Sequence, residues 1–344
     1  MKYPAKTASV IFFLLILTGC NLKKEVLISG RTMGTAYDIK VVTWFYKDTA
    51  ELKDKIEKRL KDVNNSMSVF ISESEISRFN AFNSQDKFII TGDFLRVMTV
   101  ARRIYELSGG AWDGTVYPLV DLWGFGRTEK EKQVPQKKEI EDRLANVGFD
   151  TIEISESGYL VKRNPSVGLD LASIAKGYGV DEIADVIRKE GIDNFLVEIG
   201  GEVYASGLRK DGGYWRVGIN RPDKDAPFDE VYKIVMLKNK GLATSGDYRN
   251  YFEKEGAVYT HILDPKTGYP VTNGVVSVSV IADNCTFADG LATAIMVMGY
   301  KKGLELADKI PGVECFIVIK DKDGKLTDYF SKGFGNDEKI LFER

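Results

Sequence analysis

A carboxylate and a hydroxyl stand one helical turn apart in the segment ADGLATAIMVMG. The two residues are Asp289 and Thr293, and the rest of the segment is apolar or small. Residues four apart share one face of an α-helix, so the two oxygen-bearing groups would point the same way. Hard cations prefer oxygen ligands, which makes this pair a candidate half-site for a metal. The alternative is structural: Asp289 would cap the helix and Thr293 would hydrogen-bond back to it.

A carboxylate and an ammonium group flank the start of another expected helix. Asp170 stands at a strand-to-helix junction in LDLASIAKGY, and Lys176 lies in the first helical turn. The N-terminus of a helix favours phosphate groups, and a lysine beside it adds positive charge. The P-loop pattern GxxxxGK[ST] is absent, so this is not a phosphate site of that type. The alternative is that Asp170 only caps the helix.

The single histidine of the chain, His261, opens the segment HILDPKTGYP, which has the composition of a turn between strands. No other side chain has an unperturbed pKa suited to proton transfer near neutral pH, so His261 is the candidate general base. The alternative is a hydrogen-bonded structural histidine. One histidine and three cysteines exclude the common zinc sites, so any metal must be bound mainly by oxygen, which points to magnesium or calcium.

Two glycine-rich segments have the composition of ligand-binding loops. Residues 108–126 contain two tryptophans, a tyrosine and a phenylalanine among five glycines, and flat aromatic surfaces on a permissive backbone suit a planar ring system. Residues 30–35, GRTMGT, combine glycines that allow close backbone approach with threonine hydroxyls. The alternatives are a turn-rich edge of the core and an ordinary loop that leads into a strand.

The overall composition bounds the class of protein. The chain has 344 residues, of which 44% are hydrophobic and 28% charged, so it can form a full core and is neither disordered nor fibrous. Its 48 Lys and Arg residues nearly balance its 50 Asp and Glu residues, which leaves a formal net charge of −2. Nucleic-acid-binding proteins usually have a basic surface and a high pI, so we expect no nucleic-acid partner.

Strands and helices alternate irregularly along the chain, so we expect an α+β fold with mixed or antiparallel sheets and packed helices. We expect one large domain, which could be divided into two subdomains. The pattern predicts strands at residues 36–45, 151–155, 159–163, 194–206, 275–282 and 314–320, and helices at residues 49–63, 92–107, 174–190 and 287–299. A glycine pair interrupts the strand at 194–206, and residues 127–139 are expected to form an exposed charged loop.

The first residues have the features of an export signal. Lys2 and Lys6 precede an apolar run at residues 8–17, about half the roughly 20 residues that span a bilayer. The following LTGC resembles a bacterial lipobox, in which the chain is cut before Cys20 and that cysteine is acylated. An uncleaved anchor or a chance cysteine is the alternative. We therefore expect a signal peptide at residues 1–19, a tether at 20–30 and the functional domain at 31–344.

A lipid anchor on an exported chain would hold the domain at a membrane outside the cytoplasm. We expect the periplasmic side of the bacterial inner membrane, although these residues do not distinguish it from the outer membrane. Cys285 and Cys315 could form a disulfide there. Both stand in apolar strand-like or helix-start contexts, so we expect buried free thiols.

Taken together, seven segments in chain order resemble the FAD:protein FMN transferase family, the ApbE-like flavin transferases. They are TMGT, SGGAWDGTVYPLVDLWGFG, LDLASIAKGYGVD, EIGGE, ATSGDYRNYF, HILDPKTGYPV and ADGLATAIMVMG. They extend from Thr32 to Gly299, most of the mature chain, and a lipoprotein signal is common in that family. The family usually has Phe where Trp112 stands, Pro where Gly114 stands and Tyr where Phe70 stands.

The resemblance implies a T-fold-like enzyme that uses Mg²⁺ and FAD, transfers the FMN moiety to a Thr or Ser hydroxyl of an acceptor flavoprotein, and releases AMP. Carried over to this chain, it implies Mg²⁺ ligands from the side chains of Asp289 and Thr293 and from the carbonyl of Ser173. His261 would be the base, acting with Asp289. The implied FAD contacts are Met33, Phe70, Ala111, Trp112, Asp113, Asp170, Lys176, His261 and Ile262.

Two other functions fit the same residues. One is FAD pyrophosphatase activity, in which water replaces the acceptor hydroxyl and the products are FMN and AMP. The other is a lipoprotein that binds FAD without catalysing any reaction. Incubation with FAD alone separates the first from the transferase, and tight FAD binding indifferent to Mg²⁺ would indicate the second.

Overall fold

A computed structural model describes residues 23–127, 132–227, 230–248, 250–334 and, for the backbone, 340–342. The segments expected as signal peptide and lipidation site, including Cys20, lie outside the described residues. No helix within the described ranges is both long enough and apolar enough to cross a membrane.

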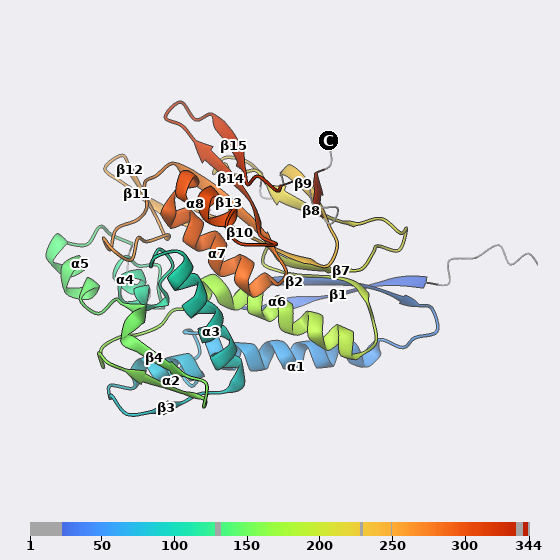
Figure 1. The fold of residues 1–344 in the computed structure, drawn as a ribbon, viewed down its shortest axis with the longest axis horizontal. Coiled ribbons are helices and arrows are strands. Elements are labelled where there is room, and N and C mark those ends of the chain that lie inside the picture. Colours follow the sequence, from blue (N-terminus) through green and yellow to red (C-terminus); the bar gives the residue numbers. More distant parts are fainter. Residues whose placement is uncertain (1–22, 128–131, 228–229, 249, 335–339, 343–344) are drawn as a thin grey trace, which may run out of the picture.

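An eight-stranded sheet runs through the molecule, and every neighbouring pair of its strands is antiparallel (Figure 1). This confirms the predicted α+β class with antiparallel pairing. The strands, in spatial order, are β1 (Lys23–Thr32), β2 (Thr35–Trp44), β6 (Asn194–Ile199), β7 (Glu202–Ser206), β10 (Lys240–Gly246), β13 (Val275–Ala282), β14 (Glu314–Lys320) and β15 (Leu326–Phe330).

The hairpin of β1 and β2 replaces part of the expected tether. Residues 23–30 belong to β1, which pairs with β2 from Lys23 opposite Trp44 to Thr32 opposite Thr35. Met33 and Gly34 form the two-residue turn, with φ angles of 48° and 74°. Positive φ at both central positions is the type I′ geometry, whose twist matches that of the strands. The segment 30–35 is therefore a hairpin end rather than an irregular loop.

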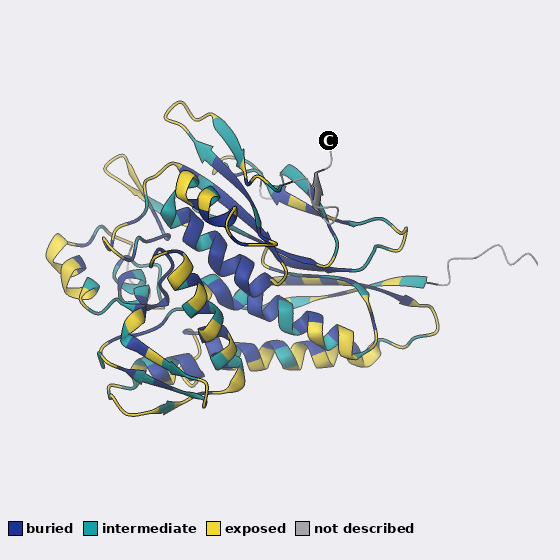
Figure 2. Cartoon of the chain, viewed as in Figure 1, coloured by how far each residue is buried: buried dark blue, intermediate teal, exposed yellow. Residues whose placement is uncertain are grey.

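Helices cover one face of the main sheet and form the larger core. They are α1 (Ala50–Met67), α3 (Gly92–Leu107), α6 (Ala172–Lys189), α7 (Cys285–Met298) and α8 (Tyr300–Ala307). Alternate strand residues such as Ile39, Val41 and Val280 face these helices. Helix α7 is almost wholly buried, as its dark blue ribbon in Figure 2 shows, because its residues are apolar or small on every side.

A second, smaller core lies on the opposite face of the sheet. Strands β8 (Trp215–Asn220), β9 (Val231–Leu237) and β16 (Ile340–Phe342) form a three-stranded sheet there. Trp215 and Val235 pack against Val42 and Ile281, the neighbours of residues that face the helices. Both faces of the main sheet are thus buried, which explains the nearly continuous apolar runs of β13 and β14.

The remaining elements form a lobe at one end of the molecule, at the left of Figure 1. Part of this lobe has a small core of its own, in which Trp123 is fully buried against Leu119, Ile140 and Leu263. The elements are α2 (Glu75–Ala81), α4 (Tyr117–Leu122), α5 (Lys137–Leu144), the sheet β3 (Phe88–Ile89), β5 (Tyr159–Lys162) and β4 (Ile152–Ser155), and the hairpin β11 (Tyr251–Lys254) and β12 (Ala257–Thr260).

Two local expectations are tested by this fold. The charged segment 127–139 is not wholly a loop, because α5 begins at Lys137 with Glu139 accepting a hydrogen bond from the Gln136 N–H. Cys285 and Cys315 are both buried and both free, as predicted from their apolar surroundings.

Candidate active site

Two adjoining clefts meet where α6 begins. The first has a volume of about 430 Å³ and the second about 460 Å³. They share a wall made of Phe70, Asp170 and Lys176 together with two small residues, so they form one extended groove. Met33 lines the second cleft. The first is lined by the other residues expected to act at the site: Ala111, Trp112, Asp113, Ser173, His261, Ile262, Asp289 and Thr293.

Hydrogen bonds to two aspartates, one on each helix, fix α6 against α7 beside the groove. Asp181 on α6 accepts the N–H groups of Cys285 and Thr286, at 2.9 and 2.8 Å, at the start of α7. Asp289 on α7 accepts the N–H of Gly177 on α6 at 2.9 Å. A Cβ at position 177 would lie 2.4 Å from the Cys285 carbonyl oxygen, so only glycine allows this approach.

Asp289 does not cap its own helix. The N-cap of α7 is Asn284, whose side chain accepts the Phe287 N–H at 2.8 Å. Asp289 lies a full turn further along, where its side chain is 4% exposed and points at α6. The capping alternative for Asp289 is therefore wrong, and the carboxylate needs another explanation.

Three charged groups meet at the floor of the first cleft, and acid outnumbers base. The Lys176 ammonium lies 2.7 Å from Oε2 of Glu202, which is 2% exposed. Burial raises the pKa of both Glu202 and Asp289, and Lys176 opposes that effect. Burial acts against the charge of Lys176, but the two carboxylates outweigh it and hold its pKa above the ordinary value. When ionised, the cluster has a net charge of −1, which favours an added cation.

Oxygen donors surround this acidic cluster. Thr293 and Ser245 share a hydrogen bond of 2.9 Å between their hydroxyls, so Thr293 does not simply bond back to its helix. Ser173 accepts the indole N–H of Trp112 at 3.0 Å. Among the described residues no group of three His, Cys, Asp or Glu side chains could hold a metal. The oxygen-rich set with its two carboxyl groups nonetheless fits Mg²⁺, which binds one or two carboxylates and completes its shell with water and phosphate.

The shared wall contains groups suited to a long, charged ligand. Asp170 accepts the Ala172 N–H at 2.8 Å, and burial raises its pKa. The N-cap of α6 is Leu171, so Asp170 stands one residue before the cap and the capping alternative for Asp170 is wrong. Phe70 is 68% exposed at the border of both clefts. A free aromatic face at that border suits stacking against a planar ring.

Trp112 and Asp113 have internal side chains, contrary to the flat binding surface expected of them. Trp112 is 2% exposed and packs edge-on against Phe149, with ring centroids 5.6 Å apart. Asp113 accepts the N–H groups of Thr115 and Phe149, at 2.7 and 3.1 Å, and burial raises its pKa. Contacts from these two residues to a ligand must therefore come from the backbone and the ring edge.

His261 stands at the root of the β11–β12 hairpin. Its Nδ1 lies 3.1 Å from the carbonyl oxygen of Asn250, at the other end of the same hairpin. A carbonyl only accepts, so Nδ1 donates its proton and Nε2 keeps a free lone pair. Burial lowers the pKa of His261, which favours the neutral imidazole. A neutral ring with a free nitrogen in the cleft wall is equipped to accept a proton.

The sequence of the chain matches a known protein family. A family model described as the ApbE family matches residues 33–317. The chain belongs to the ApbE family. It is 43% identical over 325 residues to the FAD:protein FMN transferase of Vibrio cholerae, covering 93% of this chain and 95% of that protein. The corresponding protein of Haemophilus influenzae is 38% identical over 320 residues, with coverages of 91% and 92%.

Solved ApbE structures have the same fold. The flavin transferase ApbE from Vibrio cholerae superposes with a TM-score of 0.84 at 40% identity, over 91% of this chain and 99% of that one. The apo form of the flavinyl transferase ApbE from Pseudomonas stutzeri gives 0.82 at 35% identity, over 91% and 96%.

Several polar residues at the groove were not identified as site residues from the sequence, among them Glu202, Thr244 and Ser245. Glu202 ends the EIGGE segment, and Thr244 and Ser245 lie in ATSGDY, so both stretches contributed to the resemblance. The signal for Glu202 is its acidic side chain directly after the Gly200–Gly201 turn, where β7 begins. Its role depends on a contact with Lys176, which no local pattern encodes.

Proposed function

We propose that this protein transfers the FMN moiety of FAD to a Thr or Ser hydroxyl of an acceptor flavoprotein and releases AMP. The observation that supports this most strongly is that the acidic cluster of Lys176, Glu202 and Asp289 lines the same cleft as His261, whose lowered pKa favours the neutral imidazole. The relatives named FAD:protein FMN transferase support the same chemistry. FAD is long enough to need both adjoining clefts.

The reaction exchanges one P–O bond for another. His261 Nε2 accepts the proton of the acceptor hydroxyl, and that oxygen attacks the phosphorus of the FMN phosphate. The bond from this phosphorus to the bridging oxygen breaks, and the bridging oxygen leaves with AMP. His261 then holds the proton until solvent removes it. A general base in this position contributes about 10²-fold or more to the rate.

Lys176 and a bound cation would stabilise the negative charge of the pyrophosphate. Lys176 remains an ammonium because Glu202 and Asp289 stabilise it, so it can pair with a phosphate oxygen. A bound Mg²⁺ would neutralise charge on the phosphates and the leaving group. Asp289, Thr293 and the Ser173 carbonyl are the residues that would hold the cation. The α6–α7 hydrogen bonds keep these groups in place without substrate.

One experiment tests the proposed reaction. The protein is incubated with FAD, Mg²⁺ and a candidate acceptor, and the acceptor is analysed by intact-mass spectrometry while AMP is quantified. Transfer predicts a gain equal to FMN minus water on the acceptor and one AMP for each modification. Rapid AMP release with FAD alone would instead indicate the pyrophosphatase. FAD binding with no AMP in either reaction would indicate a binding protein.

We further propose that Cys20 is acylated and tethers the domain to the periplasmic face of the inner membrane. The LTGC segment after an apolar run of ten residues supports this. Cys20→Ala should leave the chain uncleaved or release it from the membrane. Unchanged size and unchanged membrane association would contradict the anchor, and fractionation of the two membranes tests the location.

A further inference from the structure

Three aromatic side chains are exposed at the tip of one turn. Trp44, Phe45 and Tyr46 are 47%, 59% and 72% exposed, and the Lys47 N–H closes the turn on the Trp44 carbonyl at 3.0 Å. The Tyr46 ring centroid lies 6.3 Å from that of Trp44 and 5.8 Å from that of Phe45. Turn tips normally consist of small and polar residues. A contiguous aromatic tip of this kind marks an interaction surface.

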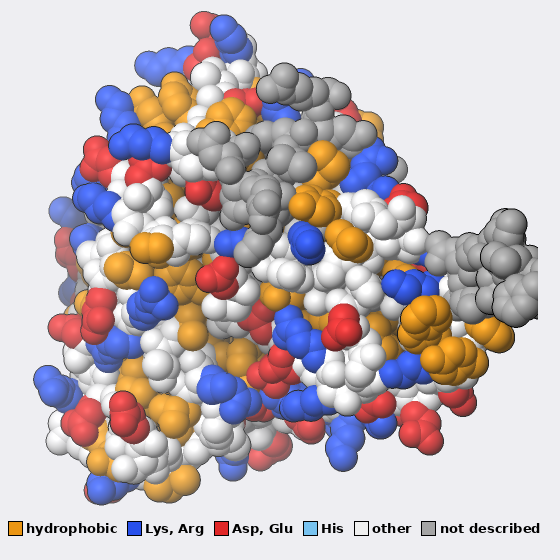
Figure 3. Space-filling view, turned by 45° about the vertical axis from the view of Figure 1, so that its right-hand side comes forward, with side chains coloured by type: hydrophobic (Ala, Val, Ile, Leu, Met, Phe, Trp, Pro, Cys, Tyr) orange, Lys and Arg blue, Asp and Glu red, His pale blue; other side chains and the backbone are white. Residues whose placement is uncertain are grey.

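The aromatic turn lies where the chain enters the sheet. Trp44 pairs with Lys23, the first residue of β1, and the Lys23 ammonium lies 5.8 Å from the Trp44 ring. Only two residues separate Lys23 from Cys20. Because an extended chain spans at most about 3.5 Å per residue, Cys20 must lie within about 10 Å of Lys23. In Figure 3, hydrophobic side chains gather on the surface beside this point.

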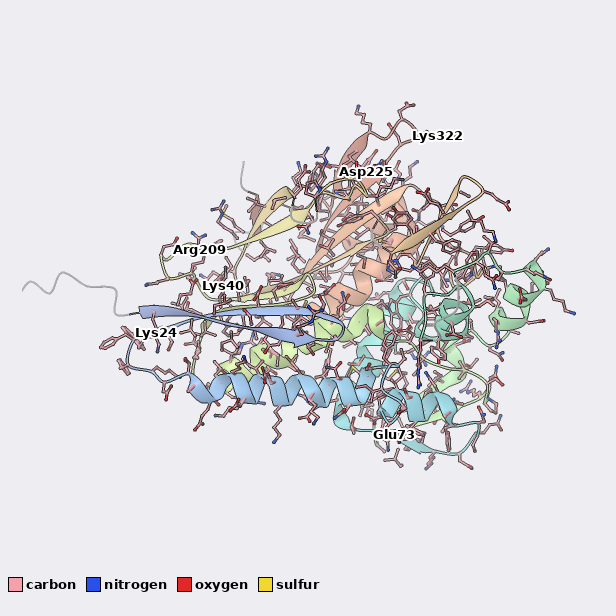
Figure 4. The ribbon with its side chains drawn as sticks, turned by 180° about the vertical axis from the view of Figure 1, so that it is seen from behind. Lys24, Lys40, Glu73, Arg209, Asp225 and Lys322 are labelled. Atoms are coloured by element: carbon pink, nitrogen blue, oxygen red, sulfur yellow. The ribbon has the colours of Figure 1, made fainter. Side chains whose placement is uncertain are left out.

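Basic side chains lie at the same end of the molecule, where the acidic Asp48, Glu51 and Glu190 stand beside Lys47. Figure 4 shows Lys24, Lys40 and Arg209 there, near the start of β1. A groove beside them is lined by four cationic side chains and two acidic ones: Lys40, Arg209, Lys210, Arg216, Glu25 and Asp211. This excess of positive charge complements the anionic headgroups of a bacterial membrane.

We infer that this end of the domain docks on the bilayer, with the rings of residues 44–46 at headgroup level beside the anchored Cys20. The inference rests on the proposed anchor and is independent of the flavin chemistry. So short a connection cannot hold the domain away from the membrane, so the surface beside it must meet lipid. Aromatic rings with flanking lysines are the side chains that favour the membrane–water interface.

Docking in this way fixes the position of the groove. Met33 lines the second cleft at the far end of the β1–β2 hairpin from Trp44. Each strand has ten residues, which at about 3.4 Å per residue gives a separation of about 30 Å. The groove is therefore held clear of the bilayer, where a soluble acceptor domain has access to it.

Tryptophan fluorescence tests the inference. The chain has four tryptophans, and Trp112, Trp123 and Trp215 are at most 3% exposed, so lipid can reach Trp44 alone. The mature chain, residues 20–344, is coupled through Cys20 to a maleimide lipid in vesicles of brominated phosphatidylcholine and phosphatidylglycerol. The other two cysteines are fully buried, and burial raises their thiol pKa values, so coupling is confined to Cys20.

We expect the emission of Trp44 to shift to the blue and to be quenched by the brominated chains, relative to vesicles of unbrominated lipid. Trp44→Phe should abolish this quenching. In that background, Ile89→Trp is the matched control, because Ile89 is 73% exposed on β3, which lies at the lower edge of the molecule, away from the start of β1 (Figure 1). The control should not be quenched. Circular dichroism verifies that each variant is folded.

Three results would overturn the inference. The first is equal Trp44 emission in brominated and unbrominated vesicles, and the second is equal quenching of the Ile89→Trp control. The third is emission that is already blue-shifted without vesicles in a protein that sediments as a dimer, which would assign the aromatic turn to a second copy. Because coupling supplies the anchor and no turnover is measured, failure of natural acylation or of flavin transfer leaves these results unchanged.

Discussion

Helix α6 takes part in two charge clusters that differ in how their charges are satisfied. One is the cleft cluster of Lys176, Glu202 and Asp289. The other, on a different face of the helix, joins Tyr178 and Glu182 to three charged residues of α1 and α3: Arg59, Asp93 and Arg96. The second cluster has two guanidinium groups for two carboxylates, whereas the first has one ammonium for two carboxylates.

The pKa shifts of the carboxyls separate the two clusters. Burial would raise the pKa of Asp93, but hydrogen bonds from Arg59 at 2.6 and 2.7 Å and from Tyr178 at 2.8 Å hold it below the usual value. The pKa of Asp289 is raised, because Lys176 and one backbone N–H do not compensate for its burial. Removing one partner from a balanced, partly buried network destabilises the fold, whereas an acidic surplus in a cleft indicates a binding site.

The largest expected effect comes from removing charge at the cleft. Asp289→Asn keeps the acceptor for the Gly177 N–H but removes the negative charge. We expect turnover to fall by about 10³-fold, equivalent to about 4 kcal/mol of transition-state stabilisation. Stability should be unchanged or higher, because the variant no longer buries a poorly compensated charge. Steady-state transfer assays and thermal unfolding measure the two quantities, and near-wild-type turnover with the same Mg²⁺ response would place the metal elsewhere.

The next largest effect on turnover should come from removing the candidate base, His261. His261→Ala should lower turnover by about 10²-fold, with FAD binding affected much less. The neutral ring is the active form, and burial lowers its pKa. The wild-type rate should therefore be flat through pH 7 and fall only below about pH 6.5, the ordinary value. A rate that already falls above pH 7 as the medium is acidified would contradict this role, and His261→Ala should lack the acidic limb.

The matched substitution in the second cluster, Asp93→Asn, should lower the stability and leave the turnover unchanged. Asp93→Asn removes the charge that Arg59 and Tyr178 stabilise, so we expect a loss of about 2 kcal/mol in the free energy of unfolding. Turnover per folded molecule should not change. Because the folded-state pKa of Asp93 is lowered, its contribution is present above the ordinary value and disappears as the pH falls through the folded-state pKa. Urea titrations at neutral and acidic pH measure this, and a loss of turnover without a loss of stability would erase the contrast.

The smallest effect should come from the hydroxyl near the acidic cluster. Thr293→Val keeps the shape of the side chain and removes its hydrogen bond with Ser245. One hydroxyl ligand or hydrogen bond contributes about 1 kcal/mol, so turnover should fall by about fivefold. The apparent affinity for Mg²⁺, measured at saturating FAD, should weaken in parallel. An effect as large as that of Asp289→Asn would show that Thr293 matters more than a neutral ligand can.

Local patterns predicted the elements better than their pairing. The helix expected at 92–107 and the strand expected at 275–282 have the observed bounds, because apolar spacing and glycine signals are local. The expected tether was wrong over 23–30, since β1 is stabilised by pairing with β2 and not by its own composition. The hairpin of β8 and β9 was also missed. Its residues cover a second sheet face, which cannot be recognised before the sheet itself is known.

In the candidate site, too, local sequence patterns were predictive and tertiary contacts were not. Apart from Cys20, every residue proposed from the motifs lines the groove, so motif order predicted which residues would converge. Side-chain orientation was not predictable. Trp112 faces the core, where its ring packs against Phe149, and Glu202 was overlooked because its partner is on another element. Such contacts depend on tertiary structure rather than on the neighbouring residues.

The hydrogen bonds that tie α6 to α7 also decide which parts of the site can move. Gly177 and Asp289 belong to two helices that pack in the largest core, so their bond should open only when that packing opens. The β11–β12 hairpin, which holds His261, lies at the edge of the molecule and has several exposed residues (Figure 2). Hydrogen exchange at the acidic wall should therefore be as slow as global unfolding, while the wall with the base exchanges faster. We therefore expect the hairpin side, rather than the acidic cluster, to be the part of the site that moves.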